Sequence, residues 1–125
     1  MNNFEFSEKM KKRTKEFAVH VVRFYRSLPK TDEARVLGRQ ILRSGTSVAA
    51  NYRAVCRAKS TADFINKLRI VEEECDESLF WMKLLVDNNF VKPSRLTALM
   101  KEADELLAII VSAAKPLAPQ GARKS

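Results

Sequence analysis

The chain has 125 residues, 46% of them hydrophobic and 30% charged, with a formal net charge of +8 at pH 7. This length and composition predict one folded domain with a sizeable core, and they exclude a disordered chain or two ordinary domains. Only 3 glycines and 4 prolines are present, which favours long helices over a turn-rich β fold.

The first predicted helix covers about residues 7–28 and ends at Pro29. Its hydrophobic residues recur at helical spacing, so they share one face: Met10, Phe17, Val21, Phe24 and Leu28. The second predicted helix covers about residues 32–58, with Thr31 as its N-cap. Its inward residues alternate in steps of three and four: Ala34, Leu37, Ile41, Ser44, Val48, Asn51 and Val55.

Within the second helix, residues 42–51 are crowded with small and polar side chains. A glycine inside a helix costs roughly 1 kcal/mol relative to alanine. Such a composition is typical of a helix whose backbone is approached closely by a neighbour. We therefore predict a packing seam, formed by Ser44, Gly45 and Val48 and joined by Trp81 from the third helix.

The third predicted helix covers about residues 61–88, and Ser60 with Asp63 three residues later resembles a capping box. Its inward residues are Phe64, Leu68, Val71, Cys75, Ser78, Met82 and Leu85. The fourth helix covers about residues 93–115 and opens on Pro93, a residue suited to the first helical position. Its inward residues are Leu96, Met100, Ala103, Leu107, Ile110 and Ala114.

Four amphipathic helices with short connections predict an all-α fold, an up-and-down antiparallel four-helix bundle over residues 1–115. The last ten residues, 116–125, contain two prolines, one glycine and two basic residues. We expect them to form a flexible basic tail.

Residues of the second and third helices form an ordered series. Residues 40–51 read QILRSGTSVAAN, residues 58–60 read AKS and residues 63–68 read DFINKL; they are followed by Glu74, Glu77, Trp81, Leu84 and Leu85. This series resembles the small four-helix-bundle family that is encoded in intervening sequences of bacterial 23S rRNA genes and is often labelled S23 ribosomal protein. The resemblance covers about residues 10–115.

The resemblance implies an up-and-down bundle that assembles as a homopentameric ring. It also implies a relationship to the accessory variability protein of diversity-generating retroelements, which works with a reverse transcriptase and its RNA. The sequence departs from the family at Ala54, where a glutamate is usual, so the polar contact of that carboxylate is lost.

The charge is distributed unevenly along the chain. The net charge is +5 over residues 1–30, +4 over residues 31–60, −4 over residues 61–90 and +3 over residues 91–125. The third helix is therefore the acidic element of a basic chain, which suits pairing within the bundle or a basic surface for a polyanion.

Basic residues follow helical spacing on the first two helices. The candidates for nucleic-acid contact are Lys11, Lys12, Arg13, Lys15, Arg35, Arg39, Arg53, Arg57 and Lys59. Guanidinium groups pair with phosphate oxygens largely regardless of sequence, so these residues predict contact with an RNA or DNA backbone. The alternative is a solvated surface that pairs with the acidic third helix. Only Tyr52 lies among these arginines, which gives little support for base stacking.

A second set of polar residues has phases that bring it in or beside the core: Arg43, Ser47, Asn51, Lys67, Glu74 and Glu77. Two carboxylates suggest acid–base chemistry or a di-metal site, but bundle metal sites use Glu-x-x-His motifs. The chain has one histidine, His20, and no such motif. We therefore predict a structural polar network, with Glu74 and Glu77 as partners for Arg43 or Lys67.

No catalytic or cofactor motif is found. Glycine-rich phosphate loops, GxSxG, HExxH and zinc spacings are absent from the sequence. Cys56 and Cys75 are 19 residues apart and form no CxxC motif, and two isolated cysteines suit structural thiols in a reducing cytoplasm. No apolar run approaches the roughly 20 residues of a membrane span, and the first residues lack the apolar core of a signal peptide.

We expect a cytoplasmic, non-enzymatic, oligomeric protein without cofactor, metal, membrane or small-molecule substrate. RNA or DNA is its expected partner besides itself. The alternative is an oligomeric scaffold that binds another protein and no nucleic acid. The ring of the first hypothesis would multiply a net charge of +8 per chain into a strong cationic field.

Overall fold

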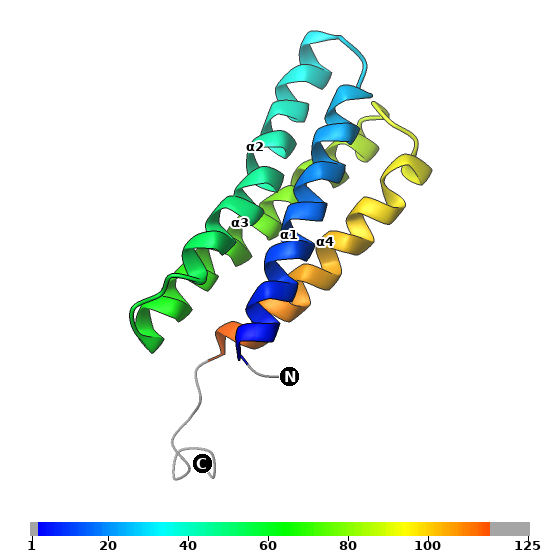
Figure 1. Ribbon diagram of the computed structural model, residues 1–125. Helices are drawn as coiled ribbons and strands as arrows, with labels where there is room; N and C mark the ends of the chain where they lie inside the picture. The colour runs from blue at the N-terminus through cyan, green and yellow to red at the C-terminus, as the bar shows by residue number, and fades with distance from the viewer. Residues whose placement is uncertain (1–2, 116–125) are drawn as a thin grey trace, which may run out of the picture.

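The computed structural model describes residues 3–115, and these residues form four long helices. They are α1 (Asn3–Arg26), α2 (Asp32–Val55), α3 (Thr61–Asp87) and α4 (Pro93–Ala114). The helices run alternately up and down, and no strand is present among residues 3–115 (Figure 1). The all-α four-helix bundle that the sequence predicts is therefore confirmed. The tail expected at residues 116–125 lies outside the described residues.

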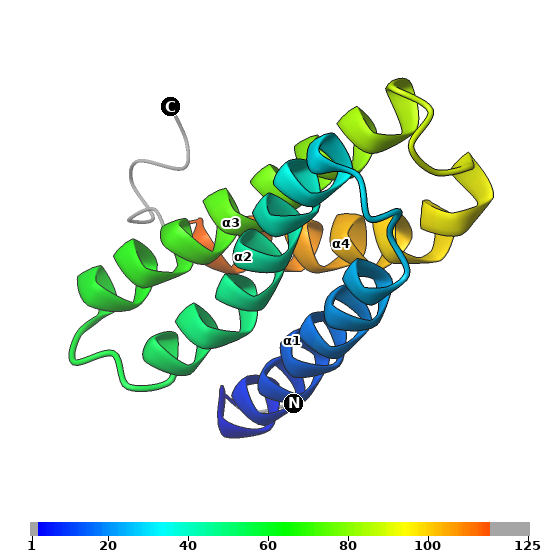
Figure 2. The same cartoon turned by 90° about the horizontal axis from the view of Figure 1, so that it is seen from above.

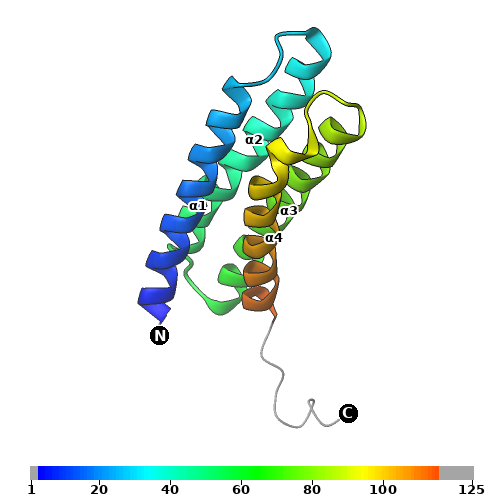
Figure 3. The ribbon, with the colours of Figure 1, turned by 90° about the vertical axis from the view of Figure 1, so that its right-hand side faces the viewer.

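Each helix packs against the next one in the chain, and α1 closes the bundle against α4. Figure 2 shows α2 between α1 and α3, and Figure 3 shows α1 and α4 on the side that faces the viewer. The α1–α4 contact is the least extensive of the four. The α1–α2 and α3–α4 turns lie at one end of the bundle and the α2–α3 connection at the other (Figure 1).

The helix ends follow local capping chemistry. The Thr31 hydroxyl accepts a hydrogen bond from the Ala34 amide at 3.3 Å, and the Ser60 hydroxyl accepts one from the Asp63 amide at 3.0 Å. Three bounds differ from the sequence expectation by two residues or more. The first helix starts at Asn3 and ends at Arg26, so Leu28 lies in the turn. The second ends at Val55: the Cys56 N–H still donates to the Tyr52 carbonyl, and the Arg57 and Ala58 N–H groups then close the last turn with bonds of the i→i+3 kind.

The core is built from the inward faces of all four helices. Every inward residue of the first helix is buried as expected. On α4, four of the six expected inward residues are buried, and Leu99 and Leu106 take the places expected for Met100 and Leu107, which are only half-buried. Tyr52 is 1% exposed, so it belongs to the core and not to the arginine surface.

The predicted packing seam on α2 has two sides. Gly45 lies against α1, where an added Cβ would stand 2.7 and 2.8 Å from the two methyl carbons of Val21. Ser44 lies against α3, where it accepts a hydrogen bond at 2.9 Å from the Ser78 hydroxyl. Both serines are fully buried. The small residues therefore let α2 approach both neighbours at once.

Trp81 is half-buried, and its ring meets that of Phe80 edge to face, with the centroids 5.0 Å apart. Its indole N–H is buried without a hydrogen-bond acceptor among residues 3–115. Val48, the third residue of the predicted seam on α2, is fully buried.

Candidate nucleic-acid interface

The outward face of α2 carries arginines along its whole length. Arg53 follows Arg35 by 18 residues, which is about five helical turns, so the two lie in line along α2, and Arg57 lies two residues beyond its end. These three arginines and Arg39 are exposed. They point away from the core because Ser44, Val48 and Tyr52 occupy the opposite side of the helix.

Arg43, in the middle of this face, is already paired. Its guanidinium donates to Glu74 Oε2 at 3.1 Å and to Glu77 Oε2 at 2.5 Å, both on α3, and to Gln40 Oε1 at 3.2 Å. The hydrogen bond that Arg43 donates to Glu77 is the main cause of the raised pKa of Arg43. Arg43 thus clamps α2 to α3 at the surface of the bundle, and two carboxylates balance its charge.

The predicted polar network divides into separate contacts. Lys67 does not reach Glu74 or Glu77, because its ammonium binds Asp63 Oδ2 at 2.6 Å within α3. The Asn51 side-chain amide donates to the Ser47 carbonyl at 2.9 Å within α2. The network of six residues that the sequence suggested is therefore one interhelical clamp, Arg43–Glu74–Glu77, and two local pairs.

Asp63 links the start of α3 to the preceding turn. Its carboxylate accepts from the Lys67 ammonium and from the Lys59 backbone N–H, which is 3.0 Å away. The first of these hydrogen bonds does most to lower the pKa of Asp63. The Asp63 carboxylate is thus bonded to the backbone N–H of Lys59 and forms no ion pair with its side-chain ammonium.

The basic residues near the start of α1 are only partly free. Lys11 pairs with Glu8 at 3.0 Å, and Arg13 lies 3.8 Å from Glu105 of α4. Lys12 and Lys15 are exposed, and no carboxylate of residues 3–115 lies within 4 Å of either. These pairings leave two of the four predicted α1 cations available.

On and beside α2, the cations without an ion pair in residues 3–115 lie toward its two ends. At the α1–α2 turn, Arg35 and Arg39 share a hollow of about 340 Å³ with residues from α1 and the turn. We call it the turn pocket; it is lined by Tyr25, Arg26, Leu28, Pro29, Lys30, Arg35 and Arg39. Arg26, Lys30 and Tyr25 were not predicted. The available signal was that Arg26 and Lys30 flank the turn at Pro29, opposite the start of the arginine row.

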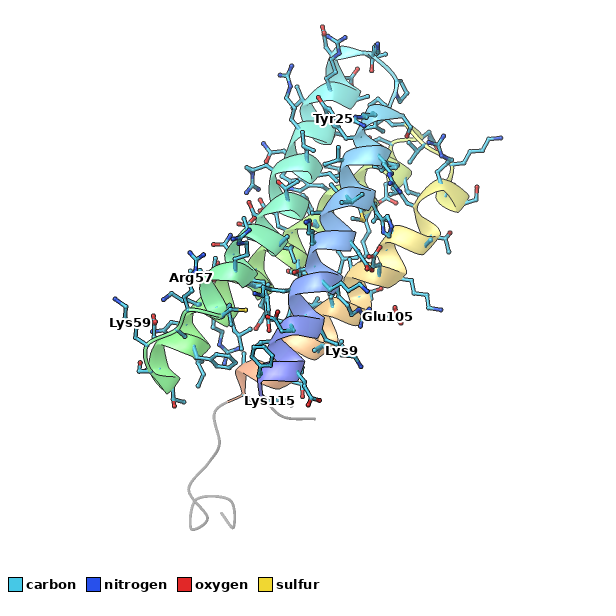
Figure 4. The ribbon with its side chains drawn as sticks, in the orientation of Figure 1. Lys9, Tyr25, Arg57, Lys59, Glu105 and Lys115 are labelled. Carbon is cyan, nitrogen blue, oxygen red and sulfur yellow. The ribbon has the colours of Figure 1, made fainter. Side chains whose placement is uncertain are left out.

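At the other end of α2, Arg53, Arg57 and Lys59 are exposed. Figure 4 shows Arg57 and Lys59 near the α2–α3 connection and Tyr25 toward the opposite end of the bundle. Arg35 and Arg57 are separated by 22 residues, which is about 33 Å along the helix axis. The described residues thus form two cationic regions, with the paired Arg43 between them.

His20 has a partner that the sequence did not reveal. Its Nδ1 lies 2.9 Å from Glu102 Oε1 on α4, and the side chains bridge the least extensive helix pair of the bundle. The two residues are 82 positions apart, so no spacing rule pairs them. The pair is on the surface, and it joins α1 to α4.

The thiols and carboxylates do not form a metal site. No group of three metal-ligating side chains gathers anywhere in residues 3–115. Cys56 is exposed and Cys75 is buried, and both thiols are free. Burial raises the pKa of Cys75 to about 12, and its sulfur donates to the Ala103 carbonyl at 3.3 Å. None of the four helices is long and apolar enough to cross a membrane.

Comparisons with known proteins agree with this architecture. Residues 7–112 match the family model of the 23S rRNA-intervening sequence protein. A crystal structure of a protein of unknown function from the S23 ribosomal protein family of Bacteroides thetaiotaomicron superposes with a TM-score of 0.79 at 36% identity. The alignment covers 86% of this chain and 99% of that chain. No curated protein matches the sequence. The chain therefore belongs to the 23S rRNA-intervening sequence protein family.

Proposed function

We propose that this protein is a non-enzymatic RNA-associated bundle that holds phosphate groups through the cations of α2. The observation that carries the proposal is the row of Arg35, Arg39, Arg53 and Arg57. All four are exposed, and none has a carboxylate within 4 Å among residues 3–115. Arginines that lack an internal partner are free to bind phosphate oxygens in a forked geometry.

RNA is the polyanion we choose to test, because the family name, 23S rRNA-intervening sequence protein, links these proteins to 23S rRNA genes. The two thiols that the structure leaves free fit a cytoplasmic location. The sequence contains none of the catalytic motifs considered above, which supports a binding role over catalysis.

A titration of binding against salt tests the proposal. Single-stranded RNA should bind at low salt, and the logarithm of the affinity should fall with the logarithm of salt concentration with a slope of about −3 if four phosphates are contacted. The double variant Arg35→Gln/Arg53→Gln should weaken binding and reduce the slope by about 1.4.

The matched control is Lys83→Gln/Arg69→Gln, which removes the same charge from exposed positions of the acidic helix α3. It should retain most of the affinity. Binding that is absent at low salt, or equal losses in the two variants, would contradict the proposal.

We further propose that the chain assembles with itself, as a pentamer. Exposed hydrophobic side chains on α2 and α3 support self-association: Val36 is 56%, Ile70 is 45% and Phe80 is 55% exposed. Light scattering should give about five times the chain mass of 14.3 kDa. Phe80→Glu should lower that mass, and a wild-type monomer would overturn the assembly.

The same exposed side chains favour the second candidate, a scaffold for another protein. Purification from the native host with and without nuclease distinguishes the two. An RNA-bound protein loses its companions after nuclease treatment, whereas a scaffold retains its protein partner.

A further inference from the structure

We propose that the turn pocket binds a terminal phosphate, either a phosphate monoester or an oligophosphate, in preference to a diester of the running backbone. The inference rests on the proposed RNA association and specifies which part of the RNA this end of the bundle recognises. A free nucleotide carries the same chemical group, so the test below separates the two sources.

The charge of the turn pocket points to an anion with more than one negative charge. Four cations line one hollow, Arg26, Lys30, Arg35 and Arg39, and no carboxylate is among the lining residues. A phosphodiester carries one negative charge, whereas a phosphate monoester carries about −1.5 to −2 at pH 7. A terminal phosphate therefore balances this cluster better than a backbone phosphate does.

None of the four cations is engaged by the protein itself. Asp32 and Glu33 are close in sequence, but neither forms a salt bridge with a turn-pocket cation, and no other carboxylate in residues 3–115 does so. Arg43 on the same helix face shows the contrast, since Glu74 and Glu77 hold it. The turn pocket thus retains its full positive charge for a ligand.

The wall of the pocket is fixed by the packing of α1 on α2. Tyr25 and Leu28 lie against Gly38, where an added Cβ would be 3.2 Å from a Tyr25 ring carbon and 2.6 Å from Leu28 Cδ1. The Leu28 N–H donates to the Tyr25 carbonyl at 3.2 Å and continues the last turn of α1. This packing fixes the backbone of α1 and α2 from which the four cationic side chains extend, which reduces the part of the ordering cost that the backbone would contribute.

The test compares one single-stranded RNA sequence with a 5′-hydroxyl, a 5′-monophosphate or a 5′-triphosphate, by fluorescence anisotropy at fixed salt. The wild-type protein should bind the phosphorylated ends about tenfold more tightly than the hydroxyl end, as charge-assisted hydrogen bonds to one extra phosphate predict. The triphosphate should bind at least as tightly as the monophosphate.

Two variants of equal charge loss locate the effect. Arg26→Gln/Arg35→Gln removes two turn-pocket cations, and Arg53→Gln/Arg57→Gln removes two at the other end of the same face. Both should bind all three RNAs more weakly. Only the first should lose the ratio between phosphorylated and hydroxyl ends. These side chains are exposed, and circular dichroism should show unchanged helicity.

Equal affinity of the wild-type protein for the three ends would overturn the inference, as would a preference that survives Arg26→Gln/Arg35→Gln. ATP is the second arm: binding equal to that of the triphosphate RNA identifies a free nucleotide as a sufficient ligand for the turn pocket.

If no RNA binds, the proposed function fails, and calorimetry with inorganic tripolyphosphate then decides the pocket alone. Tripolyphosphate should bind the wild type and the Arg53→Gln/Arg57→Gln variant but not Arg26→Gln/Arg35→Gln. Absence of binding to the wild type would overturn the turn-pocket assignment.

Discussion

Gly45 allows α1 and α2 to pack closely, because it carries a hydrogen atom where every other residue carries a Cβ. Alanine at this position would place a Cβ 3.1 Å from Val21 Cβ and still nearer to both Val21 methyl carbons, which a branched side chain has no room to move aside. The glycine is therefore required by the packing of α1 on α2, although it weakens α2 as an isolated helix.

We predict that Gly45→Ala destabilises the protein by up to about 2 kcal/mol, because overpacking costs about 1–3 kcal/mol and the better helix propensity of alanine returns about 1. Urea unfolding measures the loss. Gly38→Ala should cost less, since its nearest neighbour is the flexible end of Leu28. In a Val21→Ala background the Gly45→Ala penalty should largely disappear; an unchanged penalty would show that the clash is elsewhere.

Tyr52 is a buried side chain with an unsatisfied hydroxyl. Its oxygen has no partner at hydrogen-bond geometry among residues 3–115; burial raises its pKa to about 12, and the nearby Ser7 hydroxyl opposes part of that rise. The folded state therefore holds the phenolic proton more tightly than the unfolded state. This contribution to stability is complete below about pH 10, the ordinary pKa of tyrosine, and is lost as the pH rises toward 12.

We predict that Tyr52→Phe leaves stability at pH 7 unchanged within about 1 kcal/mol, because the substitution removes a polar group that gains no hydrogen bond. Between pH 9 and 12 the wild-type protein should lose stability faster than the variant. Thermal unfolding across this pH range measures the difference, and a large loss at pH 7 would show that the hydroxyl has a partner in solution.

At the scale of the helices, the chain ends its elements with short-range signals. Ser60 and Asp63 fix the start of α3, and the Asp63 carboxylate also accepts from the Lys59 backbone N–H at 3.0 Å. One cap therefore orders both the helix and the connection that precedes it.

We predict that Ser60→Ala lowers stability by about 1 kcal/mol, the usual cost of losing an N-cap. Ser60→Asp keeps an acceptor oxygen and should retain most of the stability. Amide hydrogen exchange at residues 61–64 should accelerate in the alanine variant only. Equal exchange in the two variants would mean that Asp63 alone maintains this end of α3.

The local nature of these signals explains what could be predicted from sequence. Helical periodicity and the caps at Thr31 and Ser60 predict the fold, because each depends on residues within one turn. The predicted inward row of α2 contains Asn51 and not Tyr52, yet Tyr52 is buried and Asn51 is only half-buried. The spacing of four between Val48 and Tyr52 would have placed Tyr52 in the core.

Contacts between helices could not be predicted from the sequence alone. The Glu102 partner of His20 is 82 residues away, and the direction of Arg43 toward Glu74 and Glu77, and not toward solvent, depends on how α2 and α3 are rotated. The turn pocket likewise joins Arg26 of α1 with Arg35 of α2, and only their packing brings them to one hollow.

At the scale of the whole molecule, the positive charge lies mainly on α1 and α2, and the negative charge lies mainly on α3. The basic helices α1 and α2 pack on each other, and the carboxylates of α3 neutralise α2 only at Arg43. The α1–α4 contact is the least extensive, and it is bridged at the surface by His20–Glu102 and Arg13–Glu105. The exposed arginines of α2 thus lie on its solvent-facing side, opposite its buried residues.

Under the proposed RNA binding, the separation of these cations sets the number of nucleotides that an RNA strand needs to reach both ends of α2. The distance of about 33 Å between the levels of Arg35 and Arg57 equals about ten stacked nucleotides at 3.4 Å each. A shorter strand reaches one end of α2 only. We predict that affinity for single-stranded RNA rises steeply as the oligonucleotide lengthens toward ten nucleotides, and that Arg53→Gln/Arg57→Gln removes this rise. Anisotropy titrations with a length series would show α2 acting as a ruler for RNA.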